Sequence, residues 1–344
     1  MKIAFAPWGE TLAELADAAR RAEDAGAEAL WVPELHRSAT VAAAALAAAT
    51  ERVRIGTGIA LAFTRSPMTT ALEALDLDEL SGGRFVLGLG TGVQRLNEDW
   101  HNVPFGKPVR HMRETVRNVR RFWESCTTGE PIDLPGEEEP MRIRGYQRPF
   151  GVQRTQIPVY LAAMGPAMTR LAGTIGDGWI SHELCSPRYL AERVLPELET
   201  GLARAEGRRR EDLDVVVSAC CSVAADRETA LRRASGLVGF YASVRTYADF
   251  FDFHGLGEQQ RAVVEAFRSG TGAEHLAGTV ATEMIDALTM AGGRDEVAER
   301  IAGYAGLADS LKLSPPTHGL SAAETRAAQD ELLSLLPDLT GGAL

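Results

Sequence analysis

Cysteine is scarce in this 344-residue sequence, and long apolar runs are absent. Cys126, Cys185, Cys220 and Cys221 include no CxxC pair and no zinc-type spacing, which predicts buried thiols in a reducing cytoplasm. No apolar stretch approaches the roughly 20 residues that cross a bilayer. The N-terminal MKIAFAPWG is typical of a strand and a turn, not of a signal peptide. These absences predict a cytoplasmic protein with no membrane partner.

Positive charge is also in short supply. The chain has 36 Lys and Arg against 47 Asp and Glu, a net charge of −11. An acidic surface repels phosphate backbones and anionic lipid headgroups, so we expect no nucleic-acid partner. Any strongly anionic ligand would need a local group of basic side chains or backbone amides.

The signature motifs of several enzyme classes are missing. There is no GxSxG nucleophile turn, and APWGE, after the first predicted strand, lacks the GxGxxG pattern of dinucleotide-binding folds. No histidines and acids have the spacing of metal ligands, and no paired acids indicate a glycosidase. The sequence therefore predicts no metal site and disfavours these classes of hydrolase.

What the sequence does contain is a regular alternation of strand and helix patterns. The predicted strands are 2–6, 29–33, 54–58, 84–89, 157–162, 178–181, 213–223 and 310–313. The predicted helices are 11–25, 40–50, 66–80, 110–125, 166–175, 187–206, 295–304 and 321–336, and a further helix begins near residue 227. Length alone would also allow two smaller domains. Eight strands that alternate with helices predict an α/β fold of the (β/α)8 TIM-barrel type, as a single domain over 1–344.

Two segments break the alternation and are predicted to be insertions. Residues 127–156 carry prolines, an acidic run and no helical or strand period. Residues 236–292 contain a group of aromatic side chains and are predicted to be inserted helical structure. Long irregular connections of this kind are commonly functional.

Glycine-rich turns follow two neighbouring strands, in RVRIGTGIALAFTRSP (52–67) and GGRFVLGLGTGVQRLNEDW (82–100). In a barrel, the carboxyl ends of all strands meet on one rim, where ligands bind. The rim candidates also include Glu34 and His36, the segment 162–166, and His182. A set rich in glycine, threonine and apolar groups predicts a site for a flat apolar ring and a phosphate.

The phosphate prediction rests on Ala162-Ala163-Met164-Gly165-Pro166. Gly165 permits close backbone approach, and the amides at the start of the following helix favour an anion. An ordinary strand-to-helix turn with proline at the first helical position explains the same residues. The pattern leaves both readings open.

Several of these motifs occur together in one known family. RVRIGTGIALAFTRSP, GRFVLGLGTG, AAMGPAMTRLAG and GDGWI resemble the luciferase-like flavin-monooxygenase superfamily, in particular its branch that uses coenzyme F420, a 5-deazaflavin. Phe240–Ser243 and His254–Gly255 resemble a mycobacterial-type subgroup of uncharacterised F420-dependent oxidoreductases. The resemblance runs in order from the N-terminus to about residue 320.

The resemblance implies roles for individual residues. The Gly58–Ile59 peptide would be a non-proline cis bond behind the middle ring of the deazaflavin. Thr57, Thr91, Gly92 and Asn97 would line the ring edges or the ribityl chain. Backbone groups of Ala162, Ala163, Gly165 and Pro166 would bind the phosphate. Glu34 stands where relatives often carry an acid near the flavin headgroup.

Two departures from the family pattern concern the proton donor. The histidine that some relatives carry after that acid would fall at Leu35, whereas the chain has His36 one residue later. The acid that sugar-phosphate dehydrogenases of the family carry after GTG would fall at Val93. Sugar-phosphate oxidation is therefore disfavoured, and Glu34, His36 and His182 remain the candidate catalytic residues.

Taken with the resemblance, the sequence predicts an F420-dependent oxidoreductase that passes a hydride between deazaflavin C5 and a small organic substrate. The resemblance also implies a homodimer. An FMN-dependent monooxygenase is the first alternative, since the same barrel supports both cofactors. A non-catalytic flavin or deazaflavin binder is the second, because neither the family histidine nor the acid is in register.

Overall fold

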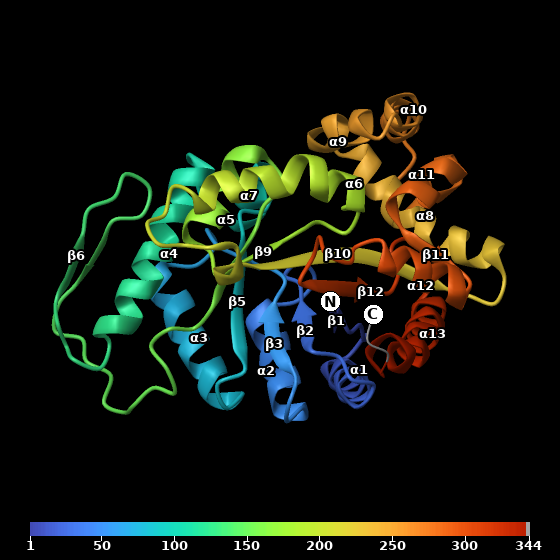
Figure 1. Ribbon diagram of the computed structural model, residues 1–344. Helices are drawn as coiled ribbons and strands as arrows, with labels where there is room; N and C mark the ends of the chain where they lie inside the picture. Colours follow the sequence, from blue (N-terminus) through green and yellow to red (C-terminus); the bar gives the residue numbers. More distant parts are fainter. Residues whose placement is uncertain (342–344) are drawn as a thin grey trace. The chain divides into compact units, whose positions relative to one another are not determined.

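A computed structural model describes residues 1–341, except for the side chains of residues 273 and 274. The chain forms two compact units (Figure 1). Unit 1 comprises Met1–Glu28, Ser181–Arg193 and Val216–Leu344. Unit 2 comprises Ala29–Ile180 and Val194–Val215.

Unit 2 is built on five successive parallel strands. They pair in the order β2 (Ala29–Val32), β3 (Arg54–Thr57), β5 (Phe85–Gly90), β8 (Val159–Ala162) and β9 (Gly178–Ile180), and the two-residue β4 (Ala60–Leu61) also pairs with β5. Nearly every residue of these strands is buried, as expected of parallel strands covered on both faces. The helices of this unit are α2 (Ala39–Ala49), α3 (Pro67–Leu80), α4 (Pro108–Ser125), α5 (Pro166–Ile175) and α7 (Leu195–Leu202).

Unit 1 contains strands from both ends of the chain. β12 (Ser310–Ser314) pairs in parallel with β1 (Lys2–Phe5) and with β10 (Asp214–Val223), which also pairs with the short β11 (Met290–Gly292). Its helices are α1 (Leu12–Asp24), α6 (Pro187–Tyr189), α8 (Arg227–Ser243), α9 (Ala248–Phe253), α10 (Gly257–Arg268), α11 (Thr282–Leu288), α12 (Arg294–Ala302) and α13 (Ala322–Gly341).

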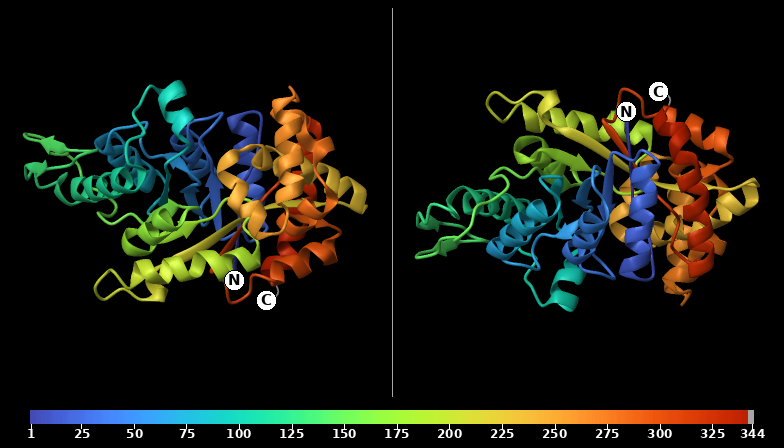
Figure 2. Two further views of the ribbon diagram at one scale, coloured as in Figure 1. Left: turned by 90° about the horizontal axis from the view of Figure 1, so that it is seen from above. Right: turned by 90° about the horizontal axis from the view of Figure 1, so that it is seen from below.

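The last helix of the chain packs on the first. α13 lies beside α1, as the view from below shows (Figure 2). Arg21 pairs with Asp330 at 2.8 Å, and the Thr340 hydroxyl donates to the Ala25 carbonyl oxygen at 3.0 Å. These contacts join the first and last helices of unit 1.

The eight predicted strands are all present, and their parallel pairing and alternation with helices are those of a (β/α)8 barrel. The predicted fold class is confirmed. The four cysteines are free and buried, as predicted. Among residues 1–341, no helix is long and apolar enough to cross a membrane. Within the same residues, no group of three or more His, Cys, Asp or Glu could hold a metal ion.

The structure differs from the expectation at one predicted helix. Residues 187–206 do not form one helix but α6, a π-helical turn at Leu190–Val194, and α7. Pro196 stands in the first turn of α7 and has no N–H to continue the hydrogen bonding of a longer helix.

The segment 127–156 contains an antiparallel hairpin, β6 (Ile132–Leu134) with β7 (Met141–Ile143), drawn in green beyond α4 in Figure 1. The Glu114 carboxylate of α4 accepts hydrogen bonds from the successive amides of Glu137, Glu138 and Glu139 at 3.2, 2.9 and 2.7 Å. These bonds fix the acidic turn of the hairpin to the helix.

The segment 236–292 is mainly helical, as expected, but its boundaries differ. Its first residues belong to α8, which continues to Ser243 because buried Leu237, Val238 and Ala242 extend its packed face. Its last residues form β11.

Candidate functional site

The turn after β3 has an unusual backbone. The Gly58–Ile59 peptide bond is cis, as the family resemblance implies. The Gly58 amide donates to the Val32 carbonyl oxygen at 2.7 Å, and the Ile59 carbonyl oxygen accepts from the Glu34 amide at 3.0 Å. The end of β2 therefore holds this turn on both sides of the peptide bond, and Gly58 and Ile59 remain partly exposed.

Thr57 lies one residue earlier and is fully buried. Its hydroxyl donates to the Gly88 carbonyl oxygen at 2.7 Å and accepts from the Gly88 amide at 2.9 Å. The side chain predicted to line a ligand thus joins β3 to β5.

The turn after β5 is held by Asn97. Its amide nitrogen donates to the carbonyl oxygens of Thr91 and Val93 at 2.8 and 3.0 Å, while the Thr91 hydroxyl donates to the Gly92 carbonyl oxygen at 2.8 Å. Gly92 has φ +63°, a conformation that favours glycine. Thr91 and Gly92 are partly exposed, whereas Asn97 is buried and its Oδ1 has no hydrogen-bond partner within residues 1–341.

The predicted phosphate segment follows β8. Gly165 is the N-cap of α5 and is exposed, and no side chain caps this helix end. Helix starts leave backbone N–H groups without intrahelical partners, which suits an anion. Pro166 itself has no N–H, so it can shape the turn but cannot donate. On the buried side, the Trp179 indole donates to the Ala163 carbonyl oxygen at 2.9 Å, which fixes the turn.

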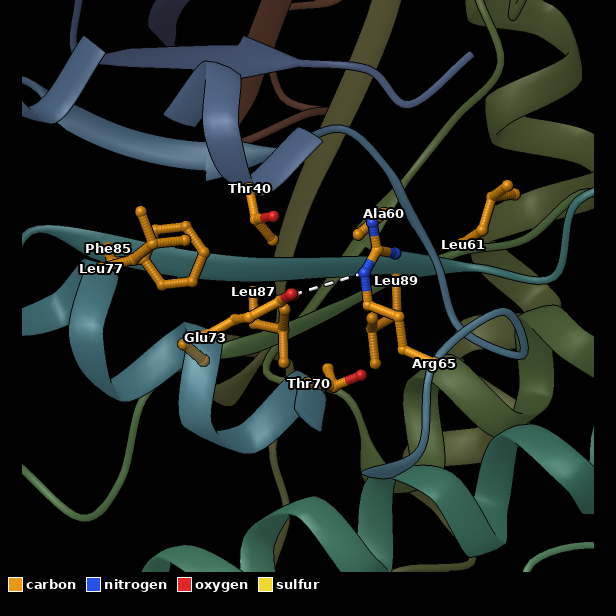
Figure 3. Close-up of a pocket in the computed structure, with 11 residues that line it drawn as sticks. Thr40, Ala60, Leu61, Arg65, Thr70, Glu73, Leu77, Phe85, Leu87 and Leu89 are labelled. Carbon is orange, nitrogen blue, oxygen red and sulfur yellow. Dashed lines mark ion pairs between the residues drawn. The ribbon is translucent and has the colours of Figure 1, made fainter. Parts of the chain in front are cut away.

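Glu34 is engaged in an ion pair. Both of its carboxylate oxygens accept from the Arg65 guanidinium, and Oε2 also accepts from the Leu61 amide at 2.8 Å. Arg65 also pairs with Glu73 of α3 at 3.4 Å, the dashed contact in Figure 3. Asp76, which lies one turn further along α3, pairs instead with Arg148 at 2.8 Å.

These contacts set the protonation of both acids. Burial raises the pKa of Glu34, but hydrogen bonds from Arg65 and the Leu61 amide outweigh it and hold the pKa below its ordinary value. Burial raises the pKa of Glu73, and the charge of Glu34 adds to this rise, against the opposing effect of Arg65. Glu34 is therefore an ionised, positioned group and not a proton donor at neutral pH.

The two candidate histidines have different surroundings. His36 and its neighbour Leu35 are exposed in the segment between β2 and α2. In unit 1, the ring of His182 contacts those of Tyr189, Tyr241, Tyr247 and Phe250, with centroids 4.8–6.3 Å away. Only His182 combines a shielded position with aromatic neighbours.

The hydrogen bonding of His182 identifies its tautomer. The Leu184 amide donates to Nδ1 at 3.2 Å, so the neutral ring carries its proton on Nε2. Nε2 is buried and has no partner among the described residues. Burial, with a smaller effect from His254, lowers the pKa of His182 to about 3. This side chain therefore offers a neutral N–H donor at physiological pH.

Sequence reasoning missed one group of residues. In β12, Ser310, Lys312 and Ser314 alternate with leucines and are all buried. Polar residues at every second position of a buried strand were the available signal.

The strand pairing and the alternation with helices define an α/β barrel. Residues 4–310 match the model of the luciferase-like monooxygenase family, and the chain belongs to that family. It is 33% identical over 298 residues to an uncharacterised protein of Mycobacterium tuberculosis (83% of this chain, 85% of that protein). It is 31% identical over 287 residues to the 5,10-methylenetetrahydromethanopterin reductase of Archaeoglobus fulgidus (81% and 82%).

A solved structure shows the same fold. The coenzyme F420-dependent tetrahydromethanopterin reductase of Methanopyrus kandleri superposes with a TM-score of 0.80 at 24% identity, covering 96% of this chain and 98% of that one. The family resemblance predicted from the sequence motifs is confirmed. Members of this family are oxidoreductases and monooxygenases, and the chain is an enzyme of this kind.

Proposed function

We propose that this protein is an F420-dependent oxidoreductase that transfers a hydride to or from a small organic substrate. The observation that carries the proposal is the exposed start of α5, which no side chain caps. This helix follows β8, a strand of the same sheet as β3 and β5. The name of the Methanopyrus relative, an F420-dependent reductase, supports the choice of F420. A deazaflavin supplies two-electron hydride chemistry at its C5 atom.

The residues of unit 2 fit the parts of such a cofactor. The α5 N-terminus would bind the phosphate through its backbone amides, because the helix dipole favours negative charge there. The partly exposed Gly58–Ile59 and Thr91–Gly92 turns would contact the ring and the ribityl chain. The Asn97 Oδ1 is an unused acceptor beside the second of these turns and would take a hydrogen bond from the ribityl hydroxyls.

We assign Glu34 a positioning role in this site. It holds Leu61 and Arg65 on one side of the β3 turn, and its own amide bonds to the Ile59 carbonyl oxygen. Because its pKa lies below the ordinary value, it does not carry a transferable proton at neutral pH.

We assign the donor role to His182. Its buried Nε2–H is neutral and unpartnered, so it can donate a hydrogen bond to a substrate oxygen without bringing in a charge. A carbonyl oxygen that gains negative charge during reduction is stabilised by such a donor. His36, which is exposed in a loop, is not assigned this role.

The test uses two variants at one position. Gly165 has φ −80°, and a Cβ there would meet no heavy atom within 4 Å, so both Gly165→Asn and Gly165→Asp fit. Both residues are good N-caps, but only aspartate adds a negative charge. We expect Gly165→Asp to bind F420 at least tenfold more weakly than Gly165→Asn, in equilibrium dialysis with fluorescence detection. The phosphate-free deazaflavin core should bind both variants equally.

Other outcomes of these binding measurements would reject the phosphate site, the cofactor or the catalytic role. Equal F420 binding by the two variants would exclude the phosphate site at α5. Tighter binding of FMN than of F420 by the wild-type protein would favour the monooxygenase, and binding of neither would remove the cofactor assignment. F420 binding without turnover over a broad panel of alcohols, ketones and enones would favour a non-catalytic binder.

The homodimer remains a prediction. Light scattering after size-exclusion chromatography would test it.

A further inference from the structure

Two neighbouring strands of unit 1 present a column of polar side chains. In β12, Ser310, Lys312 and Ser314 share one face, while Leu311 and Leu313 take the other. In β10, Ser218 is in register with Lys312, and Ser222 lies on the same face of the strand as Ser218 by alternation. All five polar residues are at least 94% buried, and Lys312 is 5% exposed.

These polar atoms lack partners. The hydroxyl oxygens of Ser218, Ser222, Ser310 and Ser314 are buried, with no hydrogen bond to any described residue. No described carboxylate lies within 4.0 Å of Lys312, and the charged group that acts on it from farther away is Glu183. Four buried hydroxyls without partners, on the strand that carries Lys312 and on neighbouring β10, are the largest group of unsatisfied side-chain atoms among residues 1–341.

The buried arginines among the described residues are paired. Arg148, 6% exposed, bonds to Asp76 at 2.8 Å, and Arg233, 8% exposed, bonds to Glu331 at 2.6 Å. Buried charges without a partner are rare in folded proteins because desolvation is costly. Lys312 thus departs from the rule that the rest of this chain follows.

We propose that Lys312 and the surrounding serines form a binding site for the carboxylate of a small organic acid. The carboxylate would supply the counter-charge that Lys312 lacks, and its oxygens would accept from the serine hydroxyls. This proposal goes beyond hydride transfer because it names the substrate as a carboxylic acid. It rests on the proposed function in one respect, that the bound acid is the substrate.

The charges at the site favour a monocarboxylate over phosphate. The site contains one cation, and Glu183 is close enough to act electrostatically on Lys312, Tyr241 and Tyr247. A phosphate group with nearly two negative charges would leave excess negative charge beside that carboxylate. Burial lowers the pKa of Lys312, against the opposing effect of Glu183, and a bound carboxylate would restore the charged form.

The site and the donor histidine share neighbouring residues. Glu183 is the residue after His182, and Tyr241 and Tyr247 contact the His182 ring. A small acid held at Lys312 would therefore have a neutral donor in the same cluster, as a 2-oxo or 2-hydroxy acid would require.

The experiment measures binding to the cofactor-free protein by isothermal titration with acetate, pyruvate and lactate. Acetamide is the uncharged probe, and inorganic phosphate is the competing oxyanion. Lys312→Met keeps the apolar stem and removes the charge, and Lys2→Met removes an exposed lysine from neighbouring β1 as the matched control. We expect Lys312→Met to weaken pyruvate binding at least tenfold, about 1.4 kcal/mol, while Lys2→Met binds as the wild type does.

Folding is checked by thermal unfolding of the same variants. Removing an unpaired buried charge should leave the melting temperature of Lys312→Met unchanged or higher. Ser218→Ala, which changes one hydroxyl, should weaken pyruvate binding severalfold. Equal binding of pyruvate by wild type and Lys312→Met, or no binding by either, would overturn the proposal. Binding of phosphate in preference to all three acids would overturn the assigned ligand class.

F420 binding by the same preparations separates the two proposals. Loss of acid binding with F420 binding intact would reject only the acid site. Acid binding without F420 binding would reject only the proposed cofactor.

Discussion

The Thr57 hydroxyl forms two hydrogen bonds with the backbone of Gly88, donating to its carbonyl oxygen and accepting from its amide. A Cβ on Gly88 would lie 1.9 Å from the Thr57 carbonyl oxygen, so only glycine fits opposite this threonine. A side chain therefore completes the pairing of β3 and β5 directly below the turn proposed to contact the cofactor.

Thr57→Val keeps the shape of the side chain and removes the hydroxyl. Because the Gly88 amide and carbonyl would then be buried without partners, we expect a loss of about 2–4 kcal/mol in the free energy of unfolding. Urea denaturation measures this loss. Thr57→Ser retains both hydrogen bonds and should lose only about 1 kcal/mol for the deleted methyl group. Equal losses in the two variants would contradict the role of the hydroxyl.

Arg65→Met would leave Glu34 and Glu73 without their shared cation. Breaking a largely buried pair should cost about 2–4 kcal/mol of unfolding free energy at pH 7. In the wild type, the pKa of Glu34 is lower in the folded protein than in the unfolded chain, so ionised Glu34 stabilises the fold above its unfolded-state pKa. This stability is lost as the pH falls through the folded-state pKa. In the variant, burial would raise the pKa of both acids, so lowering the pH from 7 to 5 should restore stability.

Denaturation at both pH values tests this reversal. Arg65→Met with Glu34→Gln carries one acid fewer and should recover part of the loss at pH 7. A deficit in Arg65→Met that is the same at pH 5 and pH 7 would show that the lost packing of the arginine stem, not charge, explains the effect.

Gly136→Ala should loosen the hairpin from α4. A Cβ there would lie 2.6 Å from the Glu114 carboxylate and 2.8 Å from the backbone of Glu139, so the three amide bonds to Glu114 would have to shift. We expect faster tryptic cleavage after Arg142 and Arg144, which are exposed on this segment. Mass spectrometry of the fragments measures the rate.

Gly151→Ala is the matched control, because a Cβ at that position meets no heavy atom within 4 Å. It should be cleaved at the wild-type rate. Unchanged cleavage of Gly136→Ala would show that the Glu114 contacts do not limit access to the hairpin.

His182 should not titrate in the physiological range. With its pKa lowered to about 3 by burial, its ring nitrogens should keep the chemical shifts of the neutral Nε2–H tautomer from pH 5 to pH 8. Nitrogen-15 NMR of histidine-labelled protein measures these shifts, and His182→Asn assigns the signals. A midpoint between pH 5 and pH 8 would contradict the shielded environment and the neutral donor role.

Much of the architecture could be predicted because it depends on local periodicity. The strands ending at Thr57 and Gly90 and the helix beginning at Pro166 follow from apolar runs, glycine turns and a proline at the first helical position. The π-helical turn at Leu190–Val194 was missed, since a continuous helical pattern concealed the effect of Pro196. The site residues were found only as members of strand ends, without their contacts.

The sequence by itself determined the strand and helix order, the glycine-rich turns and the family, because each depends on neighbouring residues along the chain. The tertiary structure decided which polar side chains form hydrogen bonds or ion pairs with one another and which have no such partner. Arg65 meets Glu34 across 31 positions, and Thr57 meets Gly88 across the same interval. Lys312 lies opposite Ser218 through strand register. Such pairings depend on how distant segments pack, which no local pattern encodes.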